Sequence, residues 1–319
     1  MQPLSRYFFP VLVAAFAAAC LYALRADIAR ISLASLVHAW DLVAVASIFS
    51  LLNYLLRIVR WQRYLARFGS SLPFRFVGLT YVAGFAFTVS PGKVGEITRA
   101  RYYSRFGVSV PDVAGAFFVE RLLDVVAMLA LAASIVTMAP RYYPALWAAG
   151  VLVAVVLVLL NVLPWGRVAA RLETQARLPR VLTRLGSGAA KALGAARSLL
   201  SPGMLLMGFV LGLAGWGLEG LGLYALGSMF PAVHLAPAAG VGIYAVAVLV
   251  GALSFLPAGL GTTEAVMTAL LAAQGYAVGE ALLITIACRI VTLWLGVLVG
   301  WIAVFALRHR TAPAVSSWQ

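Results

Sequence analysis

Two pairs of oppositely charged residues recur at one spacing within otherwise apolar sequence. Glu96 precedes Arg121 by 25 positions, and Glu264 precedes Arg289 by the same interval. A carboxylate or a guanidinium is costly to bury alone, and the two together form a strong charge-assisted hydrogen bond. Such a pair can hold helices together, or an anionic ligand can compete with the glutamate for the arginine. The repeated spacing predicts two equivalent ion pairs.

Each glutamate follows a break of proline and glycine, SPGKVGE at 90–96 and LPAGLGTTE at 256–264. Proline and glycine interrupt helices, and a helix that restarts after them exposes N–H groups and a positive dipole end, which bind phosphate. Ser90 and either Thr262 or Thr263 are the expected caps. The expected substrate-binding residues are Gly92, Lys93, Gly95, Arg121, Gly259, Gly261, Thr262 and Arg289.

Further carboxylates lie within apolar runs. Glu120 and Asp124 are four residues apart and share a helix face, and Glu219 lies in a glycine-rich stretch that permits close helix packing. Ionisable groups in such surroundings indicate function by default, although pairing that only holds the bundle together is the alternative. The expected charge-pairing or proton-coupling residues are Glu96, Glu120, Asp124, Glu264 and Glu219.

The composition assigns these groups to a membrane protein. Hydrophobic residues make up 63% of the chain and charged residues 11%, whereas a soluble domain carries about 25% charged residues. A helix needs about 20 apolar residues to cross a bilayer, which favours an all-α polytopic fold. The apolar runs cover 7–24, which we interpret as a retained span, and 42–59, 74–90, 111–138, 143–163, 203–229, 236–256 and 279–307.

Cysteine and histidine usage predicts no disulfide, metal site or cofactor. Cys20 and Cys288 lie in separate apolar runs, and His38, His234 and His309 are far apart without the spacing of metal ligands. No nucleophile elbow or other catalytic motif is recognisable, so we expect no catalytic residues.

The net charge of +14 follows the positive-inside rule and does not indicate nucleic-acid binding. If both termini are cytoplasmic and the two breaks are tips of re-entrant hairpins, eighteen basic residues face the cytoplasm and three face outside. The cytoplasmic set includes Arg57, Arg60 and Arg99. This bias predicts the bacterial cytoplasmic (inner) membrane with both termini inside.

The same topology predicts two inverted repeats. Residues 1–164 form the first half with a re-entrant hairpin at 74–106, and residues 202–319 form the second with a hairpin at 236–275. About six further helices span the membrane. Inverted repeats with broken helices are typical of secondary transporters. The alternative is two ordinary turns in a chain of eight or more spans.

A basic connector at 165–201 joins the halves. It carries seven basic residues against Glu173, has apolar residues at helical spacing, and is split by Pro179. This pattern favours amphipathic helices on the anionic cytoplasmic leaflet, with a solvated linker as the alternative.

The stretches SPGKVGEITRARYYSRFGVSVPDVAGAFFVERLLD, LPAGLGTTEA and ACRIVTLWLG resemble the lysylphosphatidylglycerol synthase transmembrane-region family over nearly the whole chain. This resemblance implies a flippase-like membrane protein. The chain contains no soluble aminoacyl-transferase domain, so lysyl transfer is not expected. One departure is Ala258, where the family usually has glycine. The matching residues are Pro91, Lys93, Gly95, Glu96, Arg99, Glu120, Arg121, Asp124, Pro257, Gly259, Gly261, Glu264 and Arg289.

The function expected is a lipid flippase or scramblase that moves an anionic phospholipid, a polyprenyl-phosphate-linked amphiphile or a related lipid between leaflets. The alternative is a membrane-embedded lipid-modifying transferase with Glu120 or Asp124 as general base, or an accessory subunit of lipid or hopanoid biosynthesis. Expected partners are membrane lipids with an anionic headgroup, together with a second copy of the chain or a lipid-biosynthesis enzyme.

Overall fold

The computed structural model describes residues 39–88, 99–136, 143–174, 179–254 and 256–308, which are helical apart from turns and short connections. The predicted all-α fold is confirmed for these residues. The apolar run 7–24, the first break and both chain ends lie outside them. The same holds for the predictions on Cys20, His38, Ser90, Pro91, Gly92, Lys93, Gly95, Glu96 and His309.

Three helices are long and apolar enough to cross a membrane, and each coincides with a predicted span. They are α4 (Trp40–Arg67), α11 (Pro202–Gly227) and a continuous helix over Val278–Leu307. This last helix contains α14 (Val278–Arg289), a π-helical turn η6 (Ile290–Trp294) and α15 (Leu295–Arg308). Pro202 begins α11 directly after the extended residue Ser201, where proline is tolerated because its missing N–H would be unpaired.

A fourth span is formed if α8 (Tyr143–Val162) and α9 (Trp165–Glu173) count as one helix bent by 73°. The described residues therefore provide three or four candidate spans rather than the six predicted for the whole chain. The predicted span at 111–138 corresponds to α7 (Val110–Val136), which is 27 residues long. Helix α7 is long enough to cross a membrane, but its charged residues Glu120, Arg121 and Asp124 make it too polar to count as a candidate span by composition.

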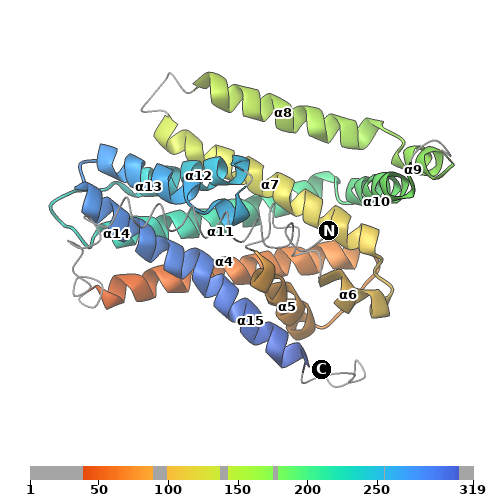
Figure 1. Ribbon diagram of the computed structural model, residues 1–319, viewed down its shortest axis with the longest axis horizontal. Helices are drawn as coiled ribbons and strands as arrows, with labels where there is room; N and C mark the ends of the chain where they lie inside the picture. The colour runs from red at the N-terminus through yellow and green to blue at the C-terminus, as the bar shows by residue number, and fades with distance from the viewer. Residues whose placement is uncertain (1–38, 89–98, 137–142, 175–178, 255, 309–319) are drawn as a thin grey trace, which may run out of the picture.

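Helix α11 lies at the centre of the bundle, where it packs against α4, α7 and α12 (Pro237–Leu253). Figure 1 shows α4 and α11 running side by side, with α7 crossing them at an angle. Glycines permit these close approaches: a Cβ atom on Gly222 would lie 3.5 Å from Ala46 of α4, and one on Gly220 would lie 2.6 Å from the Val241 backbone of α12. The predicted close packing of the glycine-rich helix is confirmed.

The second break separates two short helices that pack against each other. Helix α12 ends at Leu253, a 3₁₀ turn η5 covers Pro257–Gly259, and α13 covers Thr262–Ala273. In the first half, α5 (Phe74–Ala83) continues as the 3₁₀ turn η1 (Gly84–Phe87) and packs against α15. The described chain resumes at Arg99, followed by α6 (Ala100–Tyr103) and the 3₁₀ turn η3 (Ser104–Phe106).

The connector contains two helices, α9 and α10 (Arg180–Arg197), and α10 begins directly after Pro179 as predicted. The two helices pack together at one end of the bundle, and α10 also packs against α7. In Figure 1, α10 is seen nearly end-on while α4 and α7 run across the picture. Lys191 of α10 pairs with Glu173 of α9 at 2.7 Å, and its hydrogen bond holds the pKa of that carboxyl below its ordinary value.

Three arginines that the charge analysis assigned to the cytoplasmic side are buried in the bundle. Arg60 and Arg99 are fully buried, and Arg57 is 7% exposed. Arg57 and Arg60 are buried because α4 continues as one helix to Arg67, past the end of its apolar run, and its polar face packs inside the protein. The Arg99 guanidinium lies 4.4 Å from the ring centroids of both Trp61 and Tyr81. The side of the membrane on which these three arginines lie stays a prediction.

Candidate functional site

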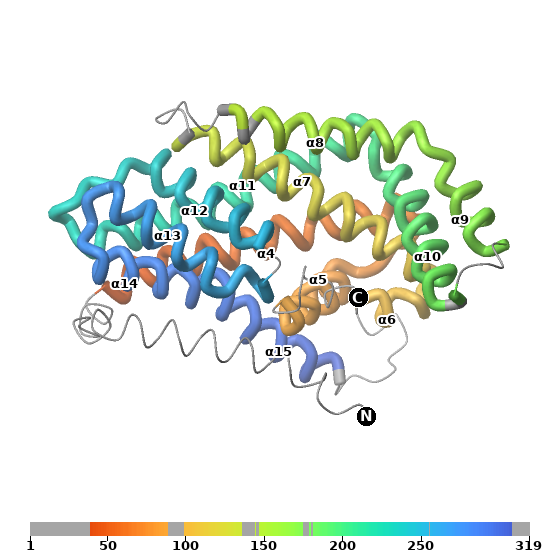
Figure 2. Tube along the Cα trace, turned by 45° about the horizontal axis from the view of Figure 1, so that its top comes forward, coloured from red at the N-terminus to blue at the C-terminus, as the bar shows by residue number. Residues whose placement is uncertain are grey.

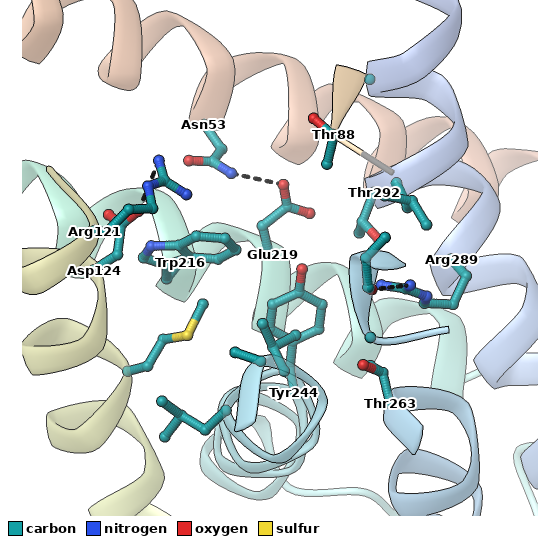
Figure 3. Close-up of a pocket in the computed structure, with 18 of the residues that line it drawn as sticks. Asn53, Thr88, Arg121, Asp124, Trp216, Glu219, Tyr244, Thr263, Arg289 and Thr292 are labelled. Carbon is teal, nitrogen blue, oxygen red and sulfur yellow. Dashed lines mark hydrogen bonds and ion pairs between the residues drawn. The ribbon is translucent and has the colours of Figure 1, made fainter. Parts of the chain in front are cut away.

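A cavity of about 290 Å³ lies between the two halves of the chain. The first half contributes α4, η1 and α7, and the second contributes α11, α12, the η5 turn, α13 and the continuous helix α14–α15. Figure 3 shows Arg121 with Asp124 on one side, Arg289 on the other, and Glu219 between them. The charged lining residues are Arg57, Arg121, Asp124, Glu219 and Arg289.

Arg289 forms the predicted ion pair with the hairpin glutamate. Its Nε lies 2.6 Å from Glu264 Oε1, and its Nη2 donates to the carbonyl oxygen of Ala258 at 3.0 Å. Arg289 therefore connects α14 to both the turn and the following helix of the hairpin. The pair is partly exposed, with the glutamate side chain 24% and the arginine side chain 9% exposed, and only Arg289 of the two lines the cavity.

The hairpin tip differs from the prediction in how α13 is capped. Gly261, with φ +85°, is the N-cap residue, so neither Thr262 nor Thr263 caps the helix as expected. Glu264 Oε2 accepts a hydrogen bond from the Gly261 N–H at 2.7 Å. A carboxylate of the protein thus occupies the helix N-terminus, and an external anion would have to compete with it.

Of the second-half residues expected to bind substrate, Gly259 and Arg289 line the cavity, whereas Gly261 and Thr262 do not. The Thr262 hydroxyl donates to Ser254 Oγ at 3.0 Å and to the Gly259 carbonyl at 3.1 Å. Thr263 lines the cavity instead. The sequence TTE gave no signal for choosing between the threonines, because their orientation depends on the position of Gly261 at the tip.

Arg121 lies among carboxylates of its own helix. Its Nη2 is 3.1 Å from Asp124 Oδ2 and 3.3 Å from Glu120 Oε2. The predicted pairing of Arg121 with Glu96 stays a prediction, because Glu96 lies outside the described residues. The two arginines nevertheless line the same cavity, as the matching spacings suggested.

Sequence reasoning missed Arg60, which connects α4 to the acidic face of α7. Its Nη2 donates to Glu120 Oε1 at 3.1 Å and to Asp124 Oδ1 at 2.7 Å, and its Nη1 donates to the Gly208 carbonyl of α11 at 3.3 Å. The Tyr81 hydroxyl also donates to Glu120. One buried guanidinium thus holds three helices together.

Arg57 was missed as well, and it lines the cavity within a group of aromatic rings. Its guanidinium carbon lies 5.1 Å from the Phe85 ring centroid, 5.6 Å from Trp216 and 5.8 Å from Tyr81, distances typical of cation–π contact. Its Nε is 3.9 Å from Glu120 Oε1.

A sequence signal for these residues did exist. Ser50, Asn53, Arg57 and Arg60 recur every three or four positions, so they occupy one face of α4 within an apolar run. All four are buried. Polar residues at helical spacing in a membrane helix face the bundle interior rather than lipid, and that rule would have located the face of α4 on which the site is built.

Glu219 is bound to this face of α4. Glu219, which is 2% exposed, accepts hydrogen bonds from Ser50 Oγ and from Asn53 Nδ2, each at 2.7 Å. The adjacent Tyr54 hydroxyl donates to the Thr292 carbonyl at 2.9 Å, within the π-helical turn that follows Arg289. Within the described residues, no group of histidine, cysteine, aspartate and glutamate side chains could hold a metal ion.

A comparison with protein families relates this architecture to known membrane proteins. The family described as the lysylphosphatidylglycerol synthase TM region matches residues 8–300, which is most of the chain. The protein belongs to this family. The lysylphosphatidylglycerol synthase TM-region family consists of membrane domains associated with lipid modification and lipid flipping, so this chain is a multi-pass membrane protein. A comparison with curated proteins gives no significant match.

Proposed function

We propose that the protein is a lipid flippase or scramblase that moves an anionic phospholipid, a polyprenyl-phosphate-linked amphiphile or a related lipid between leaflets. The observation that carries this proposal is that Arg57, Arg121 and Arg289, which come from both halves of the chain, line one shared cavity. Arginine presents a planar fork of donors that suits a phosphate better than a lysine ammonium does.

The size of the cavity supports movement of a headgroup rather than enclosure of a whole lipid. A volume of about 290 Å³ is at the small end for sites that hold drug-sized ligands, so it suits a headgroup but not two acyl chains. The acyl chains would stay in the bilayer while the headgroup passes the arginines. Apolar lining residues such as Met128, Val248 and Leu293 suit the first carbons of those chains.

The charges around Arg121 also favour an anionic ligand. Among the described residues, the α4–α7 contact brings three guanidinium groups, those of Arg57, Arg60 and Arg121, to two carboxylates, those of Glu120 and Asp124. A negative headgroup would compete with these carboxylates for the guanidinium groups. On the other side, an anion would compete with Glu264 for Arg289 and so loosen the hairpin from α14.

The proposal includes the inverted arrangement, with hairpins 74–106 and 236–275 re-entrant, in the bacterial cytoplasmic membrane with both termini inside. This arrangement is supported by helices that end before they complete a span. The two examples are α5 with η1 and α12 with α13. Irregular backbone at membrane depth is tolerated where protein or a wet cavity surrounds it. Alternating access would then move one hairpin relative to the other half.

A transferase that uses Glu120 or Asp124 as general base is the second candidate. A base must reach the proton that it abstracts. Glu120 is fully buried and does not line the cavity, and Asp124 is held by Arg60 and Arg121. These contacts favour the flippase. An accessory role beside a lipid-biosynthesis enzyme, or action as a homodimer, is compatible with the same cavity.

Reconstitution into vesicles with a panel of fluorescent anionic, zwitterionic and neutral lipids tests the function. We expect anionic lipids to move, and Arg121→Lys and Arg289→Lys each to slow them about tenfold or more, because a lost charged hydrogen bond costs about 1.5–3 kcal/mol. Arg63→Lys, an exposed position on α4, is the matched control. Unchanged movement in both folded cavity variants would contradict headgroup recognition by these arginines.

A further inference from the structure

Thr263 differs from the other hydroxyl residues at the hairpin tip in its hydrogen bonding. Its hydroxyl makes no hydrogen bond to any residue that the structure describes, although Thr263 is only 2% exposed and lines the cavity. The neighbouring Thr262 hydroxyl, by contrast, donates to Ser254 Oγ and to the Gly259 carbonyl. Because buried polar groups are almost always paired, a hydroxyl of this kind in a cavity wall is a candidate for binding a ligand.

Two glycines make room for this hydroxyl. A Cβ atom on Gly259 would lie 2.6 Å from Thr263 Oγ1, and a Cβ atom on Gly251 would overlap it. Both glycines are buried, Gly251 in α12 and Gly259 in η5. A larger residue at either position would displace the hydroxyl. The hairpin thus keeps a polar atom at a point of the cavity wall where an apolar side chain would leave no hydrogen-bonding group unpaired.

Arg289 and Thr263 contact the same turn of the hairpin. Arg289 Nη2 donates to the Ala258 carbonyl at 3.0 Å, and the Thr263 hydroxyl packs against Gly259, the next residue. Figure 3 shows both side chains on one side of the pocket, with the Thr263 hydroxyl directed toward its interior. A guanidinium and a hydroxyl both donate hydrogen bonds, and phosphate oxygens accept them. The turn therefore brings a charged donor and a neutral donor to one end of the cavity.

We propose that Thr263 is a headgroup-binding residue whose hydroxyl donates to a phosphate oxygen of the lipid, beside the charge of Arg289. This inference rests on the proposed lipid movement and adds the neutral donor that the phosphate meets at the hairpin. Thr263 is the second residue of α13, so the same contact connects the headgroup directly to the hairpin. The ligand class is a phosphate carried by a lipid.

Calorimetric binding of dihexanoyl phosphatidylglycerol, a short-chain lipid, to the full chain in detergent tests the contact. Thr263→Ser and Thr263→Ala both remove the methyl group and add no bulk beside the glycines, so they differ only in the hydroxyl. We expect the serine variant to keep the wild-type affinity within about twofold and the alanine variant to lose about tenfold or more, as for one hydrogen bond to a charged group. Equal affinities of the two variants would overturn the proposal.

Thr268→Ser and Thr268→Ala are the matched control pair. Thr268 lies on the same helix, its hydroxyl donates to Thr285 Oγ1 at 3.1 Å, and it does not line the cavity. We expect these two variants to bind the lipid equally well. A tenfold difference between them as well would show that the effect at Thr263 is not one of contact, and the proposal would fail.

Thermal unfolding distinguishes binding from a structural role of the hydroxyl. Thr263→Ala should unfold at the same temperature as Thr263→Ser or higher, because the hydroxyl has no partner in the fold to lose and alanine is the better helix former. A lower midpoint for Thr263→Ala, together with unchanged lipid affinity, would show that the hydroxyl serves the fold alone.

Two further ligands identify what the hydroxyl recognises. Dihexanoyl glycerol has the acyl chains without the phosphate, and we expect it to bind equally to Thr263→Ser and Thr263→Ala. The tenfold difference with this ligand too would contradict phosphate recognition. Inorganic phosphate has the charge without the chains, and we expect it to bind more weakly than the short-chain lipid. Equal affinities of the wild type for inorganic phosphate and for the lipid would overturn the assignment to a lipid.

Vesicle assays with fluorescent phosphatidylglycerol separate this inference from the proposed function. If the wild type moves no lipid but its binding of the short-chain lipid depends on the hydroxyl, the proposed function fails and the binding residue stands. If the wild type moves the lipid, and Thr263→Ser and Thr263→Ala bind it and move it equally, the proposed function stands and this inference fails.

Discussion

Individual buried arginines determine how the helices of the site are held together. Arg60 is fully buried and bridges Glu120 and Asp124. Its removal would leave these two carboxylates with fewer partners inside the buried contact between α4 and α7. Arg63 lies one helical turn away on the same helix but is exposed. The two arginines therefore provide a matched pair for measuring the effect of burial.

We expect Arg60→Ala to lower the free energy of unfolding by about 3–5 kcal/mol, because breaking a buried ion pair leaves an uncompensated charge. Arg63→Ala should change it by less than about 0.5 kcal/mol, as is usual for surface substitutions. Thermal or denaturant unfolding in detergent measures both. Similar losses in the two variants would contradict the burial of Arg60.

Backbone strain at the hairpin tip gives a second prediction at the residue scale. Ala258 has φ +53°, a left-handed conformation that costs a non-glycine residue about 1–3 kcal/mol, and its carbonyl accepts from Arg289. Ala258→Gly relieves this strain. The more flexible glycine backbone, however, loses more conformational entropy on folding, which costs about 0.5–1 kcal/mol. We expect stability to be unchanged or raised by about 1 kcal/mol.

The control for this variant is Ala269→Gly, at an exposed position inside α13. Glycine there should lower stability by about 0.5–1 kcal/mol, because a helix interior gains nothing from left-handed freedom. The comparison uses unfolding midpoints of both variants in the same detergent. Ala258→Gly losing as much stability as Ala269→Gly would mean that the tip is not strained.

At the scale of elements, the connector helices lie across the bundle and expose an apolar stripe. Val181, Leu182 and Leu185 of α10 are 67%, 54% and 66% exposed, and Arg184 is exposed beside them. The chain bends by 73° between α8 and α9, so α9 does not continue along the axis of α8. Figure 2 shows α9 and α10 together at the end of the bundle. Apolar residues with basic neighbours suit a helix in an anionic interface.

We expect an environment-sensitive fluorophore on Leu185→Cys, with the native cysteines replaced, to emit as in an apolar medium in vesicles of anionic lipid. The same label on Glu173→Cys, an exposed polar site on α9, should emit as in water. Lipid-borne quenchers should reduce the first signal only. Emission from water at both positions would favour the solvated-linker interpretation of the connector.

At the scale of the whole molecule, neither half of the chain encloses the cavity alone. Arg57 and Arg121 come from the first half, whereas Glu219, Tyr244 and Arg289 come from the second. The buried hydrophobic side chains also cross the division. They form two clusters, one that includes Tyr54 and Leu199 and one that includes Ala46 and Leu223, and residues of α4 and α7 pack in both. The halves therefore form one structural unit, and its orientation in the membrane decides from which side a headgroup enters.

Cysteine accessibility tests that orientation. The proposed topology predicts that a cysteine at His234, in the turn between α11 and α12, reacts with an impermeant reagent from outside. A cysteine at Ser198, just before α11, should react only after the cytoplasmic face is opened. The candidate span α11 separates the two positions. The reverse pattern would invert the predicted direction of both hairpins.

The sequence by itself determined the class of protein, its helical content, the second break and the Glu264–Arg289 pair. The length of an apolar run and the positions of proline and glycine determine where a helix begins and ends through local effects on the backbone. These features can therefore be predicted without knowing which helices are in contact. The spacing of 25 positions was informative because two antiparallel neighbours, α13 and α14, are joined by a short turn. Their contact is almost a local one.

Only the tertiary structure decided which polar side chains meet across the bundle. Arg57 and Arg60 resembled cytoplasmic charges until α4 was seen to continue beside α7 and α11. Ser50 and Asn53 lie more than 160 positions from Glu219, and Thr263 rather than Thr262 lines the cavity. These contacts depend on the rotation and depth at which distant helices pack, which residue types and local spacing do not specify.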